Sequence, residues 1–155
     1  LGPQEIQVGI LKRLRGTPII RHDDTGRMRY SPHPPYEILA TRWIDFPTMQ
    51  RLRRFAKTWD LIGNSGNFVE TTRWFWRSRP ARDAGPRSPF ATLLAFSDWL
   101  YEATGRVHAI ALPRLVELVF RYLTEIDDQL PAEIAPLLER DYRRGGRSDR
   151  PKCLA

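Results

Sequence analysis

The first part of the chain alternates apolar and polar positions. Apolar side chains fall at Ile6, Val8 and Ile10, and the same spacing returns at Met28 and Tyr30. This alternation predicts β-strands, because successive side chains of a strand point to opposite faces. The start of the chain is therefore expected to contain short strands.

Turn-forming residues separate these strands. Gly16, Thr17 and Pro18 are expected to end the first strand, residues 23–26 (Asp-Asp-Thr-Gly) to form a turn, and residues 31–35, with three prolines, to form a rigid non-helical linker. Residues 1–35 are thus predicted to be a fragment of a β-containing unit.

From residue 36 onward the apolar spacing lengthens to three and four residues, which is typical of helices that bury one face. Asp45 and Ser88 are expected to cap helices because each precedes a proline in the first helical turn, and Gly63 to end one. The predicted helical segments are 36–44, 45–62, 68–77, 88–105, 111–126 and 131–142.

These segments predict a mainly α fold: a compact bundle of five or six helices at residues 36–142, preceded by the short β-containing segment at 1–35. Residues 143–155 are basic and rich in glycine, and are expected to form a loose tail. Because hydrophobic residues make up 41% of the 155 and charged residues 28%, the composition excludes a disordered chain.

Cysteine content and hydropathy indicate the cellular compartment of the protein and whether it crosses a membrane. Cys153 is the single cysteine, so it forms no internal disulfide and holds no metal cluster alone; this indicates a reducing, cytoplasmic compartment. No apolar run approaches the roughly 20 residues that cross a bilayer, so no membrane partner is expected. The start, Leu1-Gly2-Pro3, lacks Met and is interpreted as a protease scar or as the cut end of a longer polypeptide.

Positive charge is concentrated in one region. The formal net charge is +7, and residues 42–87 hold nine Arg and one Lys against four acidic residues. Composition bias of a GC-rich genome explains an excess of arginine without any function. A local surplus instead predicts a contact face for an acidic protein, nucleic acid or a phosphate-bearing ligand. We take Arg51, Arg54, Arg73 and Arg77 as its candidate members.

The run from Arg73 to Arg77 places aromatic side chains between arginines. This pattern suits stacking on nucleic-acid bases with contacts to phosphates. The same pattern is typical of an amphipathic helix that anchors its rings in a core while its arginines reach solvent, and this second interpretation is favoured.

No catalytic residue and no metal ligand is predicted. The three histidines, His22, His33 and His108, are scattered, and none stands in a nucleophile motif or at metal-ligand spacing. The pair Asn64 and Ser65 stands between glycines after a helix, where a helix-ending turn is expected. Acidic residues near one another are interpreted as solvated, namely Asp23-Asp24, Asp127-Asp128 and Asp141 beside Arg143.

Three stretches together resemble a known family. Residues 7–12 leading to 16–19 are similar to the late barrel strand of radical-SAM enzymes, and residues 30–39 to the exit from that barrel. The segment 45–68 resembles the uncharacterised helical domain that follows the cobalamin-binding and radical-SAM domains of a group of bacterial proteins, as do residues 88–90 and 96–101. The resemblance covers nearly the whole chain.

The resemblance implies a parent enzyme with a four-iron cluster, S-adenosylmethionine and, as a further candidate, cobalamin. Such enzymes hold the cluster with a C-x-x-x-C-x-x-C loop, which this chain lacks, so catalysis and cofactors are expected upstream and none in this fragment alone. Its partners would be the upstream barrel and cobalamin-binding domains. Gly16, Thr17 and Pro18 match positions near the S-adenosylmethionine pocket. The helical domain would close the open side of the barrel, with Asn64 and Ser65 facing the substrate.

Two other interpretations stay open. The chain could be a free-standing basic helical module that binds nucleic acid, which steeply salt-dependent binding would favour. It could also be an interaction domain that docks on another, acidic protein. A strand with one apolar face needs a sheet to pair with, so residues 1–30 are expected to be poorly satisfied on their own.

Overall fold

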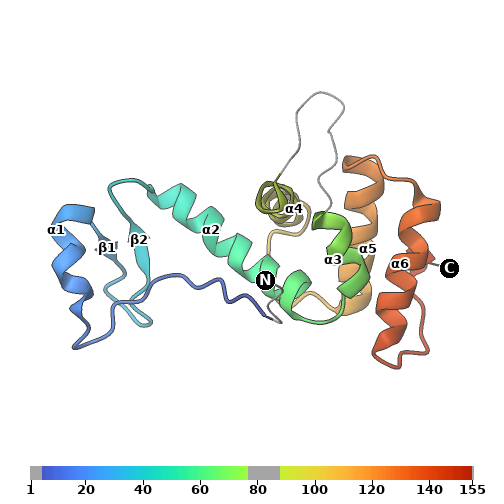
Figure 1. Cartoon of the computed structure of the whole chain (residues 1–155), viewed down its shortest axis with the longest axis horizontal. Helices are drawn as coiled ribbons and strands as arrows, with labels where there is room; N and C mark the ends of the chain where they lie inside the picture. Colours follow the sequence, from blue (N-terminus) through green and yellow to red (C-terminus); the bar gives the residue numbers. More distant parts are fainter. Residues whose placement is uncertain (1–4, 77–87, 155) are drawn as a thin grey trace. The chain divides into compact units, whose positions relative to one another are not determined.

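The computed structural model describes residues 5–76 and 88–154 (Figure 1). The chain is mainly α-helical, with one small antiparallel sheet near its N-terminus, which confirms the predicted fold class. It forms two compact units, Leu1–Ala56 (the N-terminal unit) and Lys57–Ala155 (the helical unit). The predicted change of character lies after residue 35, whereas the units divide inside helix α2 (Phe46–Trp59).

The N-terminal unit is built on a short hairpin. Strand β1 (Arg29–Tyr30) pairs in antiparallel fashion with β2 (Ile38–Ala40). Residues 11–13 lie beside the start of β2, because Leu11 O accepts a hydrogen bond from Ile38 N (2.9 Å) and Arg13 N donates one to Tyr36 O (3.0 Å).

The strand predicted from Ile6, Val8 and Ile10 is wrong in its position. Within the described residues, only Lys12 forms a bridge in this part of the chain, to Glu37, and residues 6–10 belong to no strand. Alternation at these positions gives a strand one apolar face, but it supplies no neighbouring strand to pair with.

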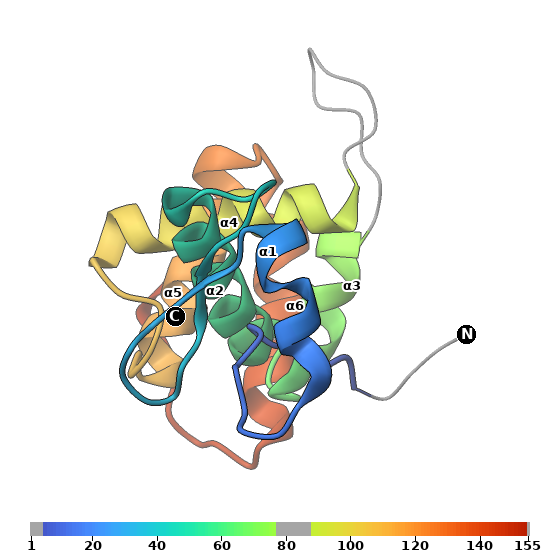
Figure 2. The same cartoon turned by 90° about the vertical axis from the view of Figure 1, so that its left-hand side faces the viewer.

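Two other local predictions in this unit are corrected. The expected turn at Asp23–Gly26 is helix α1, one helical turn that follows a 3₁₀ turn, η1 (Pro18–His22), and that lies beside the hairpin in Figures 1 and 2. The helix predicted for 36–44 is wrong, since β2 occupies this segment. Tyr36 has a φ of 56°, outside the right-handed helical region, and Ile38 pairs with Tyr30 in the hairpin.

Helix α2 begins as the sequence predicts. Asp45 Oδ1 accepts a hydrogen bond from Thr48 N at 2.9 Å, and Pro47 follows in the first turn. An N-cap of this kind satisfies a backbone donor that has no partner inside the helix. The structure thus confirms the predicted N-cap.

The end of this helix lies later than predicted. A π-helical segment, η2 (Asp60–Asn64), prolongs α2, and the left-handed residue is Gly66 (φ 72°), not Gly63. Gly63 has another reason to be glycine, because an added Cβ would lie 3.0 Å from an atom of the Trp59 indole. A close approach, not a helix end, therefore explains that residue.

The helical unit contains the four helices expected after residue 67. They are α3 (Val69–Trp76), α4 (Pro89–Thr104), α5 (Leu112–Arg121) and α6 (Pro131–Arg144), with a π-helical segment η3 (Tyr122–Ile126) and a 3₁₀ turn η4 (Lys152–Leu154). The Ser88 cap is confirmed, as Oγ accepts from Ala91 N at 3.2 Å, and α4 ends at Gly105 (φ 70°). Helix α3 packs on α4 and α6, and α5 packs on α6.

Aromatic side chains fill the centre of the helical unit. The ring of Phe96 lies 5.4 Å from that of Phe75 and 5.0 Å from that of Tyr122, which in turn lies 5.4 Å from Trp99. Phe75, Phe96 and Tyr122 are buried. Phe75 belongs to the run 73–77, so its burial supports the interpretation of that run as part of a core.

The tail lies on the helical unit. Tyr142 Oη donates to Asp149 Oδ2 at 2.6 Å, Arg150 forms an ion pair with Glu139 at 3.3 Å, and Leu154 is buried. Segment η4 contacts both α5 and α6. Helix α6 continues two residues past its predicted end, and the looseness of the tail in solution stays a prediction.

Candidate functional site

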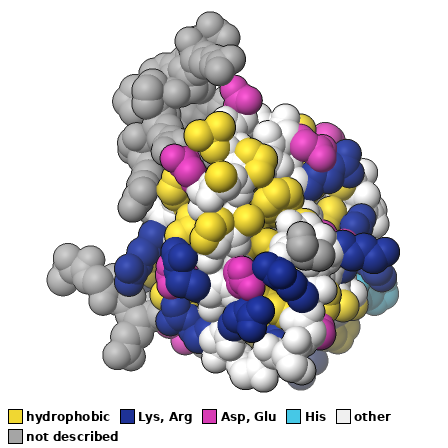
Figure 3. Space-filling model, turned by 90° about the vertical axis from the view of Figure 1, so that its right-hand side faces the viewer, with side chains coloured by type: hydrophobic (Ala, Val, Ile, Leu, Met, Phe, Trp, Pro, Cys, Tyr) yellow, Lys and Arg dark blue, Asp and Glu magenta, His cyan; other side chains and the backbone are white. Residues whose placement is uncertain are grey.

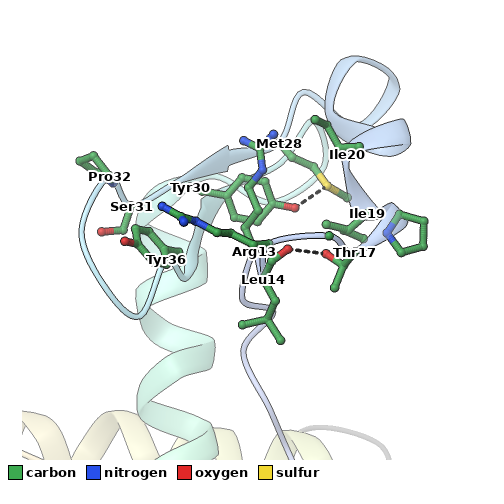
Figure 4. Close-up of a pocket in the computed structure, with 13 residues that line it drawn as sticks. Arg13, Leu14, Thr17, Ile19, Ile20, Met28, Tyr30, Ser31, Pro32 and Tyr36 are labelled. Carbon is green, nitrogen blue, oxygen red and sulfur yellow. Dashed lines mark hydrogen bonds between the residues drawn. The ribbon is translucent and has the colours of Figure 1, made fainter.

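The N-terminal unit carries a hollow of about 740 Å³ (Figure 4). It is lined by residues 13–20, by part of the hairpin and by Tyr36. Gly16, Thr17 and Pro18, the three predicted cofactor-binding residues, are among the lining residues. The volume falls in the range of about 300–1,000 Å³ that small-molecule sites occupy.

A tight turn shapes one wall of this hollow. Gly16 has a φ of 76°, which a residue without a Cβ adopts at little cost. Thr17 Oγ1 donates a hydrogen bond to Leu14 O at 2.7 Å, and Pro18 begins the turn η1. A Cβ on Gly16 would meet no atom within 4 Å, so this side of the turn is open.

An arginine and a tyrosine form the polar centre. The Arg13 guanidinium lies 5.4 Å from the centre of the Tyr30 ring and forms an ion pair of 2.8 Å with Asp23. Tyr30 Oη donates to Met28 Sδ at 3.1 Å. Burial, with a smaller contribution from Asp23, raises the pKa of the Tyr30 phenol, while Arg13 opposes the rise. Tyr30 is thus a protonated donor at neutral pH, and Asp23 is paired rather than simply solvated as predicted.

Apolar side chains surround this centre. Figure 4 shows Ile19 and Ile20 on one side of Arg13 and Tyr30, and Tyr36 with Pro32 on the other. Ile20 and Leu14 are each 61% exposed, an unusual fraction for large apolar residues that line one hollow. Exposed apolar clusters mark sites of binding. The arrangement suits a planar or apolar group that carries a hydrogen-bond acceptor or a negative charge.

Asn64 and Ser65, the predicted substrate-facing pair, belong to the helical unit and do not line this hollow. Asn64 Nδ2 donates to Asp60 Oδ1 at 3.2 Å. Ser65 Oγ donates to Leu61 O at 2.7 Å and accepts from Asn67 N at 3.2 Å. In this structure both side chains help to end the helical segment η2.

The four candidates for a basic face do not share one element. Arg51 and Arg54 are on α2, Arg73 is on α3, and Arg77 lies outside the described residues. Arg73 lines a second hollow of about 440 Å³, together with side chains of α3 and α6. On the side where α6 lies, Lys and Arg side chains gather in a band with acidic ones between them (Figure 3).

Asp141 was predicted to be solvated, and this is wrong. The residue is 3% exposed, and its carboxylate accepts hydrogen bonds from Glu70 N (3.0 Å), Thr71 N (2.8 Å) and Thr71 Oγ1 (2.8 Å). It therefore caps helix α3 from α6. Its spacing from the apolar residue Leu138, three positions earlier, was the signal that placed it on the buried face.

The single cysteine has a half-buried thiol. Burial first, and then the charge of Glu117, raise the pKa of Cys153, so the neutral thiol dominates at neutral pH. Across residues 5–76 and 88–154, no three His, Cys, Asp or Glu side chains are grouped in a way that could hold a metal ion. Within the same residues, no helix has the length and apolar character needed to span a membrane.

These features define a mainly α-helical domain whose N-terminal unit carries a hollow of small-molecule size. The chain belongs to the family described as protein of unknown function (DUF4080), whose model matches residues 26–155. Gly16, Thr17 and Pro18 precede the matched range. No curated protein and no solved structure matches the chain.

Proposed function

We propose that this chain is the non-catalytic C-terminal accessory domain of a cobalamin-type radical-SAM enzyme. In this proposal the N-terminal unit completes the radical-SAM barrel and its cofactor pocket, and the domain helps to shape the substrate site. The observation that carries the proposal is the hollow around Gly16, Thr17 and Pro18, whose apolar walls are open to solvent in the chain alone.

The exposed apolar surface of the N-terminal unit supports docking to another part of the protein. Trp43, in the turn before α2, is 73% exposed, and Phe46, the first residue of α2, is 52% exposed. Thr41 fixes this turn, because its Oγ1 accepts hydrogen bonds from Trp43 N (3.2 Å) and Ile44 N (3.0 Å). Rigid, exposed aromatic residues are typical anchors of protein interfaces.

The residues of the hollow fit part of S-adenosylmethionine and do not fit an iron–sulfur cluster. Ile19 and the ring of Tyr30 offer apolar surface to an adenine, and Gly16 leaves room for a close approach. A cluster needs several thiolates, and the chain has one cysteine. We therefore assign the cluster, and cobalamin if it is used, to the upstream domains.

The first experiment uses the full-length protein that contains this chain. We expect it to bind iron and to cleave S-adenosylmethionine, and Thr17→Val to lower the affinity for S-adenosylmethionine because the Leu14–Pro18 turn loses its hydrogen bond. Thr124→Val is the matched control, since Thr124 Oγ1 likewise donates to a backbone carbonyl, that of Phe120 at 2.9 Å, in the helical unit.

A metal-free full-length protein that leaves S-adenosylmethionine intact would overturn this proposal. Steeply salt-dependent binding of RNA or DNA by that protein would then favour the alternative, a basic module that binds nucleic acid. The role of the pair Asn64 and Ser65 is tested separately. We expect Asn64→Ala to impair turnover without unfolding the protein, and unchanged activity would remove that assignment.

A further inference from the structure

A groove in the helical unit lies between α3 and α6, and its function is independent of the proposal above. It measures about 440 Å³ and is lined by Val69, Glu70, Arg73 and Trp74 of α3 and by Leu137 and Arg144 of α6. Three of these residues are apolar or aromatic and three are charged. The groove therefore offers one surface to a ring and another to a charge.

The acidic groups of the groove are already engaged. Glu70 Oε2 accepts a hydrogen bond from Arg140 Nε at 2.8 Å, and Glu70 Oε1 lies 3.5 Å from Arg144 Nη2. The carboxylate of Asp141 is taken up by the backbone of α3, at Glu70 N and Thr71 N. Both carboxylates thus already have partners, and Asp141 Oδ1 also lies 3.8 Å from Arg144 Nη2.

The arginine side chains at the groove are exposed enough to donate further hydrogen bonds. The side chains of Arg140 and Arg144 are 54% and 49% exposed, although both are paired with Glu70. Arg73 lies on the rim and is exposed, and no ion pair of it is seen within the described residues. A guanidinium presents several donors in a fork that matches the oxygens of a phosphate.

We propose that this groove binds a phosphate monoester carried on a planar ring, as in a nucleoside monophosphate or an aryl phosphate. The phosphate contacts Arg73 and Arg144, and the ring lies on the surface of Trp74, Val69 and Leu137. The carboxylate of Glu70 competes with the phosphate, because both pair with the guanidinium of Arg144. Affinity for the ligand is therefore set by the balance between the external anion and the internal carboxylates, which are Glu70 and the more distant Asp141 at 3.8 Å from Arg144 Nη2.

Two substitutions with opposite expected effects test this proposal in the whole chain. Binding of adenosine monophosphate is measured by calorimetry at low salt, with adenosine and inorganic phosphate as separate probes. We expect Arg73→Gln to weaken binding about tenfold, as for one lost charge-assisted hydrogen bond. Glu70→Gln should tighten binding about threefold, since it releases Arg144 from a half-exposed ion pair.

The pair Arg121 and Glu125 supplies the matched controls. These residues form an exposed ion pair of 2.7 Å outside the groove, so Arg121→Gln and Glu125→Gln change the net charge equally and should leave binding unchanged. The inference is overturned if adenosine monophosphate does not bind at millimolar concentration, or if adenosine binds equally well. Equal weakening by Arg121→Gln and Arg73→Gln would also overturn it, because binding would then follow net charge alone.

Discussion

The two units of the molecule bury their apolar residues very differently. Among the described residues, the buried apolar ones of the N-terminal unit are Ile38, Met49, Phe55 and Ala56, whereas the helical unit holds the remaining seventeen, among them the aromatic cluster around Phe96. Conversely, of the eleven exposed large apolar side chains in the described residues, seven belong to the N-terminal unit. The helical unit thus closes a core of its own, while the N-terminal unit presents much of its apolar surface to solvent.

Secondary structure in the two units follows the same contrast. The helical unit joins long helices by side-chain hydrogen bonds between buried groups, such as Thr58 Oγ1 to Ser97 Oγ at 3.1 Å. Before α2 begins, the N-terminal unit has only strands of two and three residues, a 3₁₀ turn and a single α-helical turn. A two-stranded hairpin is marginal in water without further packing. The difference indicates which unit is stable by itself and which one depends on its surroundings.

The largest expected effect breaks the core of the helical unit. Phe96→Ala removes a fully buried ring that contacts Phe75 and Tyr122, and we expect it to lower the free energy of unfolding by about 3–5 kcal/mol. The counterpart in the N-terminal unit, Ile20→Ala, should cost less than about 0.5 kcal/mol because the side chain is exposed. Urea unfolding measures both, and equal losses would contradict the contrast between the units.

The next effect concerns the cap that links two helices of the same unit. Asp141→Asn places an amide donor opposite the backbone donors of Glu70 and Thr71, so we expect a loss of about 1–3 kcal/mol in the free energy of unfolding. Glu125→Gln, at a side chain that is 56% exposed, is the control and should be nearly neutral. A loss for Asp141→Asn no larger than for this control would show that the cap contributes little.

A smaller effect appears in acid and lies in the N-terminal unit. Hydrogen bonds from Thr48 to the carboxylate lower the pKa of Asp45 below its ordinary 3.8. A depressed folded-state pKa contributes stability that is present above pH 3.8 and is lost as the pH falls through the folded-state value. Asp45→Asn keeps the cap without a titrating group, so its α2 should lose less stability between pH 5 and pH 2. Amide exchange of α2 measures this, and identical acid profiles would contradict the assignment.

The smallest effect is electrostatic and tests the polar centre of the hollow. Asp23 contributes to the raised pKa of Tyr30, whereas Arg13 lowers that pKa. Asp23→Asn removes the negative charge that raises the pKa of Tyr30 and leaves the lowering effect of Arg13, so this pKa should fall. NMR titration of the tyrosine ring carbons measures the change, with Asp24→Asn as the control of equal charge. An unchanged or higher pKa would show that Asp23 does not act on the phenol.

The sequence predicted the helical unit well because its information is local. Periodic apolar residues and the cap Ser88 set its helices, and the cap is present in the structure; the same local signal placed Asp45, which caps α2 in the N-terminal unit. The N-terminal unit was predicted poorly because a strand also needs a partner strand. Residues 6–10 have the apolar–polar alternation of a strand, but they have no partner strand and form none. Ile38, in a segment expected to be helical, instead pairs with β1 across the hairpin.

Some residues of the candidate site could also be predicted from local sequence, and others could not. Glycine and proline predict a turn, so the sequence alone was enough to select Gly16, Thr17 and Pro18. Arg13 and Tyr30 stand far apart along the chain and meet only through the hairpin, so nothing local marked them as neighbours. Asp141 caps α3 through Glu70 N, which lies seventy-one residues earlier in the chain, and such a contact follows only from the packing of α3 on α6.

Amide hydrogen exchange on the isolated chain tests the central contrast most directly. We predict that the amides of α4 and α5 exchange only through global unfolding, while residues 7–10, which belong to no strand, exchange close to the rate of an unstructured peptide. In a longer protein with the proposed upstream domains, the same residues should become protected. Protection of residues 7–10 equal to that of α5 in the isolated chain would contradict the account, since the N-terminal unit would then need no partner.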